Sequence, residues 1–244
     1  MFSTLHLSVA DLGLCVVAAA AGAVVQGTIG FGYALVVVPT LLLVAPATIP
    51  ATPLVVALPM VVVLAVKDRE HLDVAGFTRL TAGRIPGTAL GAWILTVVGT
   101  RVIGGAAGTL LMLAVAASVV RGVTRTSHRL EVAAGFFSGV AGTVGAVGGP
   151  YLGLAYADRP GPVLRATVSA AFAVGVVISL VAIAAAGSLG GPAARLGVAM
   201  IPATFAGLWV GRRLAGRLDG RWLRPAVNGF AGAAGLFALL RALL

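Results

Sequence analysis

Residues 136–151 read Phe-Phe-Ser-Gly-Val-Ala-Gly-Thr-Val-Gly-Ala-Val-Gly-Gly-Pro-Tyr, and this stretch decides the fold. It carries no charge, and its glycines separate two short apolar segments, at 131–142 and 150–157. A full bilayer crossing needs about 20 apolar residues, so neither segment crosses alone. The stretch therefore predicts a hairpin that enters a membrane and returns. Backbone of this kind is tolerated at membrane depth only where protein buries it or where it lines a wet cavity.

The composition of the whole chain agrees with a membrane setting. Of its 244 residues, 59% are hydrophobic and only 10% are charged, and the mean hydropathy is +1.07. A soluble domain normally carries about 25% charged residues. We therefore expect an integral membrane protein whose main partner is the lipid bilayer, without room for a sizeable soluble domain.

The net charge of +10 raises the alternative of nucleic-acid binding. The arginines lie between apolar runs, however, and aromatic residues make up only 6% of the chain, which is thin for base stacking. We therefore expect no nucleic-acid partner and assign the charge to membrane orientation.

Apolar runs separated by charged or Gly/Pro-rich breaks predict an all-α fold with about eight to ten membrane segments. The expected helices lie at 9–27, 33–46, 50–66, 79–98, 102–120, 131–142, 150–157, 163–186, 195–211 and 226–243.

The breaks between these helices differ in charge. Four of them, near 67–79, 121–129, 159–165 and 212–224, hold 13 of the 17 basic residues. By the positive-inside rule these four loops face the cytoplasm. The C-terminus then lies outside, and so does the N-terminus if the first two segments form a hairpin that returns to its own side.

The chain also repeats itself. Gly27-Thr28-Ile29-Gly30 recurs as Gly142-Thr143-Val144-Gly145, 115 positions later, and Ala51-Thr52 recurs as Ala166-Thr167 at the same offset. Residues 85–93 recur at 201–209, 116 positions later, with five of nine identical. Chance similarity between Gly/Ala-rich helices is the alternative, but three matches at nearly one offset favour a repeat.

The repeat and the charge pattern together predict two halves, 1–125 and 126–244, within one membrane domain. Each half reads as a Gly-rich hairpin followed by three crossings, the first beginning outside and the second inside. Inverted repeats of this kind are common in secondary transporters, where the substrate binds near the midplane between the repeats.

The two hairpin tips are the predicted binding site. Their returning arms begin near Tyr33 and Pro150, and the free N–H groups and dipole of a helix start favour an anion. Glycines at the tips let a ligand approach the main chain, although tight helix packing is the alternative for any one of them. Neutral side chains that add hydrogen bonds are Gln26, Thr28, Tyr33, Ser138 and Thr143.

Arg84 is the remaining candidate, because it lies about five residues into the apolar run predicted as a helix at 79–98. An arginine inside a membrane helix is a functional candidate that suits an anion, and snorkelling to the cytoplasmic surface is the alternative. The full set of candidate substrate-binding residues is Gln26, Gly27, Thr28, Gly30, Gly32, Tyr33, Arg84, Ser138, Gly142, Thr143, Gly148, Gly149 and Pro150.

Signatures of catalysis do not appear in this chain. The sequence has no metal-ligand spacing, no Walker loop and no Ser-His-Asp arrangement within the apolar runs, so we expect no enzyme, no metal and no cofactor. No acidic residue is placed deep in a predicted helix, so a carboxylate-based proton or cation relay is not evident.

Two stretches, one at each hairpin, carry a recognisable pattern. The first is Gly-Phe-Gly-Tyr-Ala-Leu-Val-Val-Val-Pro-Thr-Leu at residues 30–41. The second combines residues 135–143 with Gly148-Gly149-Pro150, Leu154-Ala155-Tyr156 and Arg165-Ala166-Thr167. In both stretches the sequence resembles the TauE/SafE family of sulfite exporters. The resemblance implies a multi-pass transporter of the bacterial inner membrane for small anions such as sulfite, sulfonates or related sulfur compounds.

The expected function is therefore export of such an anion by alternating access between the two repeats. Two alternatives stay open, a non-transporting membrane subunit that scaffolds a partner and a passive anion channel. The coupling ion, proton or sodium, and a homo-oligomeric state are also left open.

Overall fold

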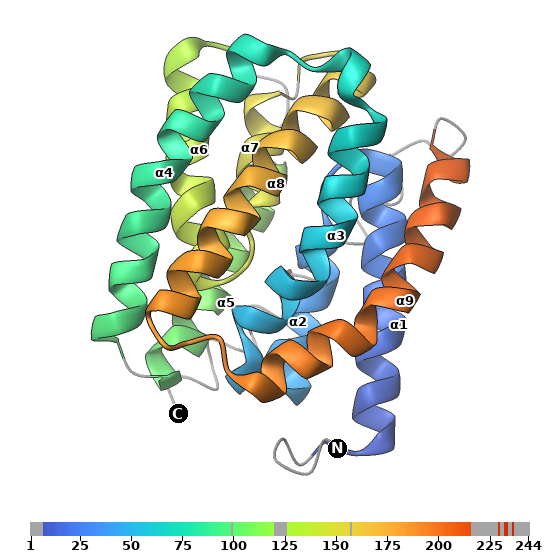
Figure 1. Ribbon diagram of the computed structural model, residues 1–244, viewed down its shortest axis with the longest axis vertical. Coiled ribbons are helices and arrows are strands. Elements are labelled where there is room, and N and C mark those ends of the chain that lie inside the picture. Colours follow the sequence, from blue (N-terminus) through green and yellow to red (C-terminus); the bar gives the residue numbers. More distant parts are fainter. Residues whose placement is uncertain are drawn as a thin grey trace.

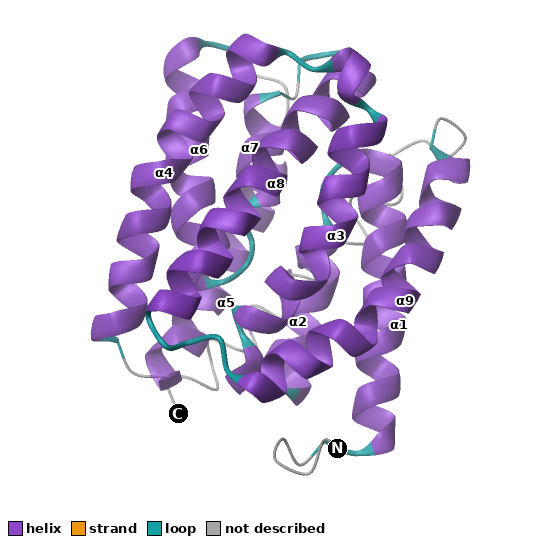
Figure 2. Cartoon of the chain, in the orientation of Figure 1, coloured by secondary structure: helices purple, strands orange, loops and turns teal. Residues whose placement is uncertain are grey.

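The computed structural model describes residues 7–98, 100–119, 126–156 and 158–215, together with positions 229, 232, 233 and 236. Within these residues every regular element is helical and there is no strand (Figure 2). The helices are α1 (Val9–Ile29), α2 (Tyr33–Val44), α3 (Ala51–Lys67), α4 (Val74–Val97), α5 (Thr100–Val119), α6 (His128–Val144), α7 (Gly149–Ala155), α8 (Gly161–Ala185) and α9 (Gly191–Leu214), with 3-10 turns η1 (Pro46–Thr48) and η2 (Arg69–His71).

Nine predicted helices are confirmed in place, while the tenth, at 226–243, falls almost entirely outside the described residues. The largest difference is the start of α4, which lies at Val74 instead of residue 79. Asp73 caps this helix, because its Oδ1 accepts a hydrogen bond of 3.0 Å from the backbone N–H of Gly76. The cap lies before the apolar run, so hydropathy alone placed the start too late.

The lengths of the helices fit a membrane protein. Among the described residues, α1, α8 and α9 are long and apolar enough to cross a membrane. By contrast α7 has seven residues and rises only about 10 Å. Tyr156, directly after α7, donates a hydrogen bond to Asp73, while Arg79 pairs with Glu131 near the start of α6. The α6–α7 hairpin thus returns to the end of the molecule from which it starts.

The closest packing in the fold joins α4 to α6, and it depends on glycines. A Cβ atom at Gly83 would lie 2.0 Å from the carbonyl oxygen of Val132, and one at Gly87 would lie 2.1 Å from that of Phe136. The two positions rise together along both helices, so α4 and α6 run parallel with their backbones almost touching. Small residues allow this kind of approach between membrane helices.

A second parallel pair, α1 with α9, is built in the same way. A Cβ atom at Gly207 would lie 2.1 Å from the carbonyl oxygen of Ala20, and one at Gly211 would lie 2.4 Å from that of Val24. Each pair therefore combines one helix from the first half of the sequence with one from the second half.

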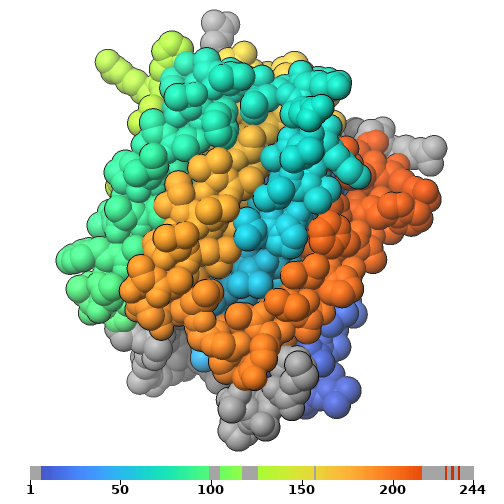
Figure 3. Space-filling view, viewed as in Figure 1, coloured from blue at the N-terminus to red at the C-terminus, as the bar shows by residue number. Residues whose placement is uncertain are grey.

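Helices α3 and α8 lie between the two pairs. Figure 3 shows α4, α8, α3 and α9 side by side across one face, and α8 contacts both α4 and α3. In Figure 1 the helices α1, α3 and α9 run upward, whereas α4, α6 and α8 run downward. The fold thus contains two helix groups, one of α4, α6, α7 and α8 and one of α1, α2, α3 and α9, that meet mainly along α3 and α8.

Candidate functional site

The two hairpin tips meet at one small cavity in the middle of the fold. Its volume of about 10 Å³ has room for about one water molecule. Residues of the first tip, of the second tip, of α3 and of α8 line it together: Gln26, Gly32, Tyr33, Ala34, Pro53, Leu54, Ala57, Ala146, Gly149, Pro150 and Phe172.

The first tip is held by the side chain of Gln26. Its Nε2 donates to the carbonyl oxygen of Gly30 at 3.0 Å, and its Oε1 accepts from the backbone N–H of Tyr33 at 3.1 Å. Gly30 and Gly32 adopt left-handed backbone angles, with φ of 98° and 115°, which glycine adopts without strain. The Gln26 side-chain amide thus provides hydrogen-bond partners for the backbone at the bend between α1 and α2, and Gln26 also lines the cavity.

The second tip packs against the side chain of Ser138. A Cβ atom at Gly148 would lie 2.7 Å from both the carbonyl oxygen and the Oγ of Ser138, so only glycine fits there. Gly149 and Pro150 then begin α7 and line the cavity.

Next to the second tip lies the side chain of Arg84, which is fully buried. Arg84 is the tenth residue after Val74, which places it about 15 Å along α4. Its Nη1 donates to the Oγ of Ser138 at 2.9 Å, and its Cζ lies 4.9 Å from the centre of the Phe172 ring. The guanidinium points into the protein and does not extend to the surface as a snorkelling side chain would.

Part of the Arg84 guanidinium has no hydrogen-bond acceptor among the described residues. Among the described residues, its Nε and Nη2 have no hydrogen-bond acceptor, and no carboxylate pairs with it. Gly175 presses on one side, where an added Cβ would lie 1.6 Å from Nε, and Gly142 lies at Nη2, where the distance would be 3.0 Å. A buried charge without a partner is costly, so this arrangement favours a bound anion.

The structure divides the predicted site residues into three sets. Gln26, Gly32, Tyr33, Gly149 and Pro150 line the cavity. Arg84, Ser138, Gly142 and Gly148 form the adjoining cluster around the guanidinium, and Thr143 lies just beyond it, with its Oγ1 2.9 Å from the Oγ of Ser179.

The other three predicted residues have packing contacts. Thr28 donates to the carbonyl oxygens of Val24 and Gly211, and Gly27 packs against the backbone of α9. Gly30 faces Arg165, where an added Cβ would lie 2.6 Å from its Cγ.

Two residues of α8 were missed by the sequence interpretation. Phe172 lies between the cavity and the guanidinium and touches both, and Gly175 provides the space that Arg84 occupies. In the sequence they are one of nine phenylalanines and one of 34 glycines, and only their place opposite Arg84 distinguishes them.

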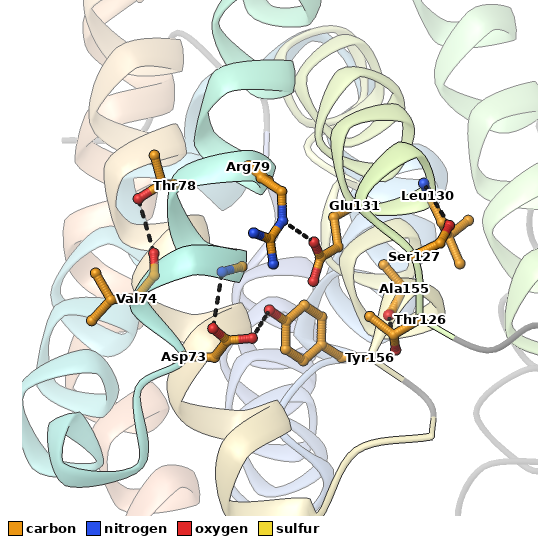
Figure 4. A network of polar contacts seen from close by, with 11 residues as sticks. Asp73, Val74, Thr78, Arg79, Thr126, Ser127, Leu130, Glu131, Ala155 and Tyr156 are labelled. Atoms are coloured by element: carbon orange, nitrogen blue, oxygen red, sulfur yellow. Dashed lines mark hydrogen bonds and ion pairs between the residues drawn. The ribbon is translucent and has the colours of Figure 1, made fainter.

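A polar network lies at the end of the fold that carries the predicted cytoplasmic loops (Figure 4). The hydroxyl of Tyr156 donates to Oδ2 of Asp73 at 2.8 Å, and Arg79 pairs with Glu131, which is fully buried although it lies only one turn into α6. The hydrogen bond from the Gly76 N–H is the main cause that lowers the pKa of Asp73 below its usual value. Burial, followed by the hydrogen bond to Asp73, raises the pKa of the Tyr156 hydroxyl.

Comparison with protein families matches residues 14–238 to "Sulfite exporter TauE/SafE". No curated protein and no solved structure matches the chain. The match covers nearly the whole sequence and includes both hairpin tips, Arg84 and all nine described helices from the second turn of α1 onward. The chain therefore belongs to the TauE/SafE sulfite exporter family, a family of membrane transporters.

Proposed function

We propose that this protein is a secondary transporter that exports a small anion, such as sulfite, a sulfonate or a related sulfur compound, across the bacterial inner membrane. The observation that carries the proposal is Arg84, a fully buried cation with two nitrogens, Nε and Nη2, that lack a hydrogen-bond acceptor and with no acidic partner among the described residues. The protein's membership of the TauE/SafE family points to the same class of substrate.

The chemistry of Arg84 suits an oxyanion. A guanidinium is planar and always charged, and it can hold two oxygens of one ligand at once. Ser138 Oγ already accepts a hydrogen bond from Nη1, so Nε and Nη2 remain to donate to the substrate. With Phe172 on one face, an anion would exchange its water shell for charge-assisted hydrogen bonds within an apolar surround.

Access to this site must change during transport. The cavity between the tips is too small for an oxyanion, and the backbone of Gly175 lies directly against Nε of Arg84. We propose that this conformation is closed to both sides, and that α8 moves relative to α4 to admit the anion. The two inverted repeats supply the parts for such alternating access.

Several contacts support the inverted relation between the repeats. Thr52 in α3 donates to the carbonyl oxygen of Ala193 near the start of α9, and Thr167, 115 positions later in α8, accepts from the N–H of Asp73 at the start of α4. Trp93 near the end of α4 is exposed, and so is its counterpart Trp209, 116 positions later, near the end of α9. The two helices run in opposite directions in Figure 1. Tryptophans favour both membrane interfaces.

The test is anion efflux from liposomes that contain the purified protein, with sulfite, sulfoacetate, taurine, sulfate, lactate and chloride as candidate substrates. We expect saturable efflux and counterflow for a sulfur oxyanion or sulfonate, which a passive channel would not show. Arg84→Gln should abolish it, whereas Arg129→Gln, on the exposed side of α6, should not. Absence of flux for every anion in correctly inserted protein would refute the proposal.

A further inference from the structure

Buried hydroxyl groups follow the Arg84 cluster along α4, α6 and α8, and we call them the second polar layer. It consists of the hydroxyl groups of Thr88 in α4, Thr143 in α6 and Ser179 in α8, each at most 1% exposed. Thr88 and Ser179 follow Arg84 and Gly175 by four residues, which corresponds to about 6 Å along the helices and keeps them on the same faces.

The hydrogen bonds of this layer are incomplete. Thr143 and Ser179 bond to each other at 2.9 Å, and Thr88 Oγ1 has no partner among the described residues. A hydroxyl in a membrane helix usually bonds to a carbonyl of the preceding turn or to a neighbouring helix. A fully buried hydroxyl without any partner therefore points to a ligand or water that occupies the layer during the working cycle.

The other helix group provides a comparison within the same molecule. The repeat offsets of 115 and 116 pair Thr88 with Thr204, and Ser179 with Leu64. Thr204 donates to the carbonyl oxygen of Met200 in its own helix, and Leu64 is buried and apolar. Arg84 itself corresponds to Met200. The same offset pairs Thr143 with Thr28, which donates to the carbonyl oxygens of Val24 and Gly211. Of these matched positions, those in α4, α6 and α8 thus carry the cation and the hydroxyl without a partner.

We infer that Thr88, Thr143 and Ser179 form the next station for the anion, which receives it from Arg84 and passes it toward the face opposite the basic loops. This inference rests on the proposed function. Uncharged hydroxyls can donate hydrogen bonds to an oxyanion without holding it as strongly as a guanidinium, which suits release. Helix α6 ends at Val144, one residue after Thr143, so it adds no further turn beyond the layer.

Cysteine labelling tests this path, and the chain has a single cysteine, Cys15, which Cys15→Ser removes. In that background Thr88→Cys and Ser179→Cys report on the layer, and Thr204→Cys and Leu64→Cys are the matched controls. The probe is a membrane-impermeant methanethiosulfonate that carries a sulfonate, applied separately to each face of oriented vesicles. Gel filtration of each variant checks that it folds.

We expect both layer variants to react roughly tenfold or more faster than their controls, and faster from the face opposite the basic loops, because the layer opens to water during the cycle. Equal rates in the two pairs, in protein that still exports anions, would overturn the path while leaving the proposed function. Fast labelling in protein that moves no tested anion would instead overturn export, and with it the assignment of the layer to an anion.

Discussion

The single methyl group added by Gly175→Ala should disable the Arg84 site. A Cβ atom at this position would lie 1.6 Å from Nε, 2.0 Å from Cζ and 2.3 Å from Cδ of Arg84. Carbon contacts normally begin near 3.5 Å, so the side chain of Arg84 would have to move by roughly 2 Å. The guanidinium would then leave its position beside Ser138 and Phe172.

The expected cost follows from the contacts that would be lost. The bond from Nη1 of Arg84 to Ser138 is 2.9 Å long and is donated by a charged group. Hydrogen bonds of this type contribute about 1.5–3 kcal/mol. If the anion makes bonds of similar strength to Nε and Nη2, loss of one of them would weaken apparent affinity by about 10- to 150-fold.

The assay is the concentration dependence of anion efflux from liposomes, together with the thermal unfolding of each variant in detergent. Gly13→Ala is the matched control, because a Cβ atom at Gly13 in α1 meets nothing within 4 Å. If Gly175→Ala reached half-maximal efflux at the same anion concentration as wild type, the placement of the anion at Arg84 would be refuted. A lower unfolding temperature with unchanged half-saturation would assign Gly175 to packing alone.

Three further predictions test other parts of the structure. Gly149→Leu should abolish transport while the protein still inserts, because the side chain fills the cavity between the tips, and unchanged uptake would count against that site. Gly87→Ala should lower stability by about 1–3 kcal/mol in thermal unfolding, whereas Gly13→Ala should not, because the new Cβ meets a carbonyl oxygen of α6 at 2.1 Å. The fold lowers the pKa of Asp73 from its ordinary value of 3.8, so the ionised carboxylate stabilises the folded state above pH 3.8. This stabilisation is lost as the pH falls through the lowered pKa. The unfolding temperature should therefore drop less on acidification in Asp73→Asn than in wild type.

The helices were predictable because hydropathy runs and Gly/Pro breaks are local properties of the chain. The same reasoning placed α4 five residues too late, since the Asp73 cap precedes the apolar run. That error made Arg84 look one turn from the surface, whereas the structure places it near the middle of a bilayer-sized helix. A correct cap would have favoured a buried arginine over a snorkelling one.

The surroundings of Arg84 could not be read from the sequence, because they depend on contacts between distant helices. Ser138 was a candidate only because it lies in a hairpin, and its bond to Arg84 spans 54 positions. Nothing in α8 marks Gly175 as the residue that admits a guanidinium. The sequence placed no acidic residue deep in a helix, and the full burial of Glu131 beside Arg79 became visible only in the fold.

Each of the two close helix pairs joins one helix from the first half of the chain to one from the second half, which affects how such a protein could be divided or assembled. Because α1 packs on α9 and α4 packs on α6, each half of the chain keeps its glycine-lined surface for a partner that the other half supplies. A chain of half this length would bury neither surface alone. It would need a second copy to cover them, and under the proposed inverted relation between the halves that copy would be inserted in the opposite orientation, as in an antiparallel dimer joined into one polypeptide.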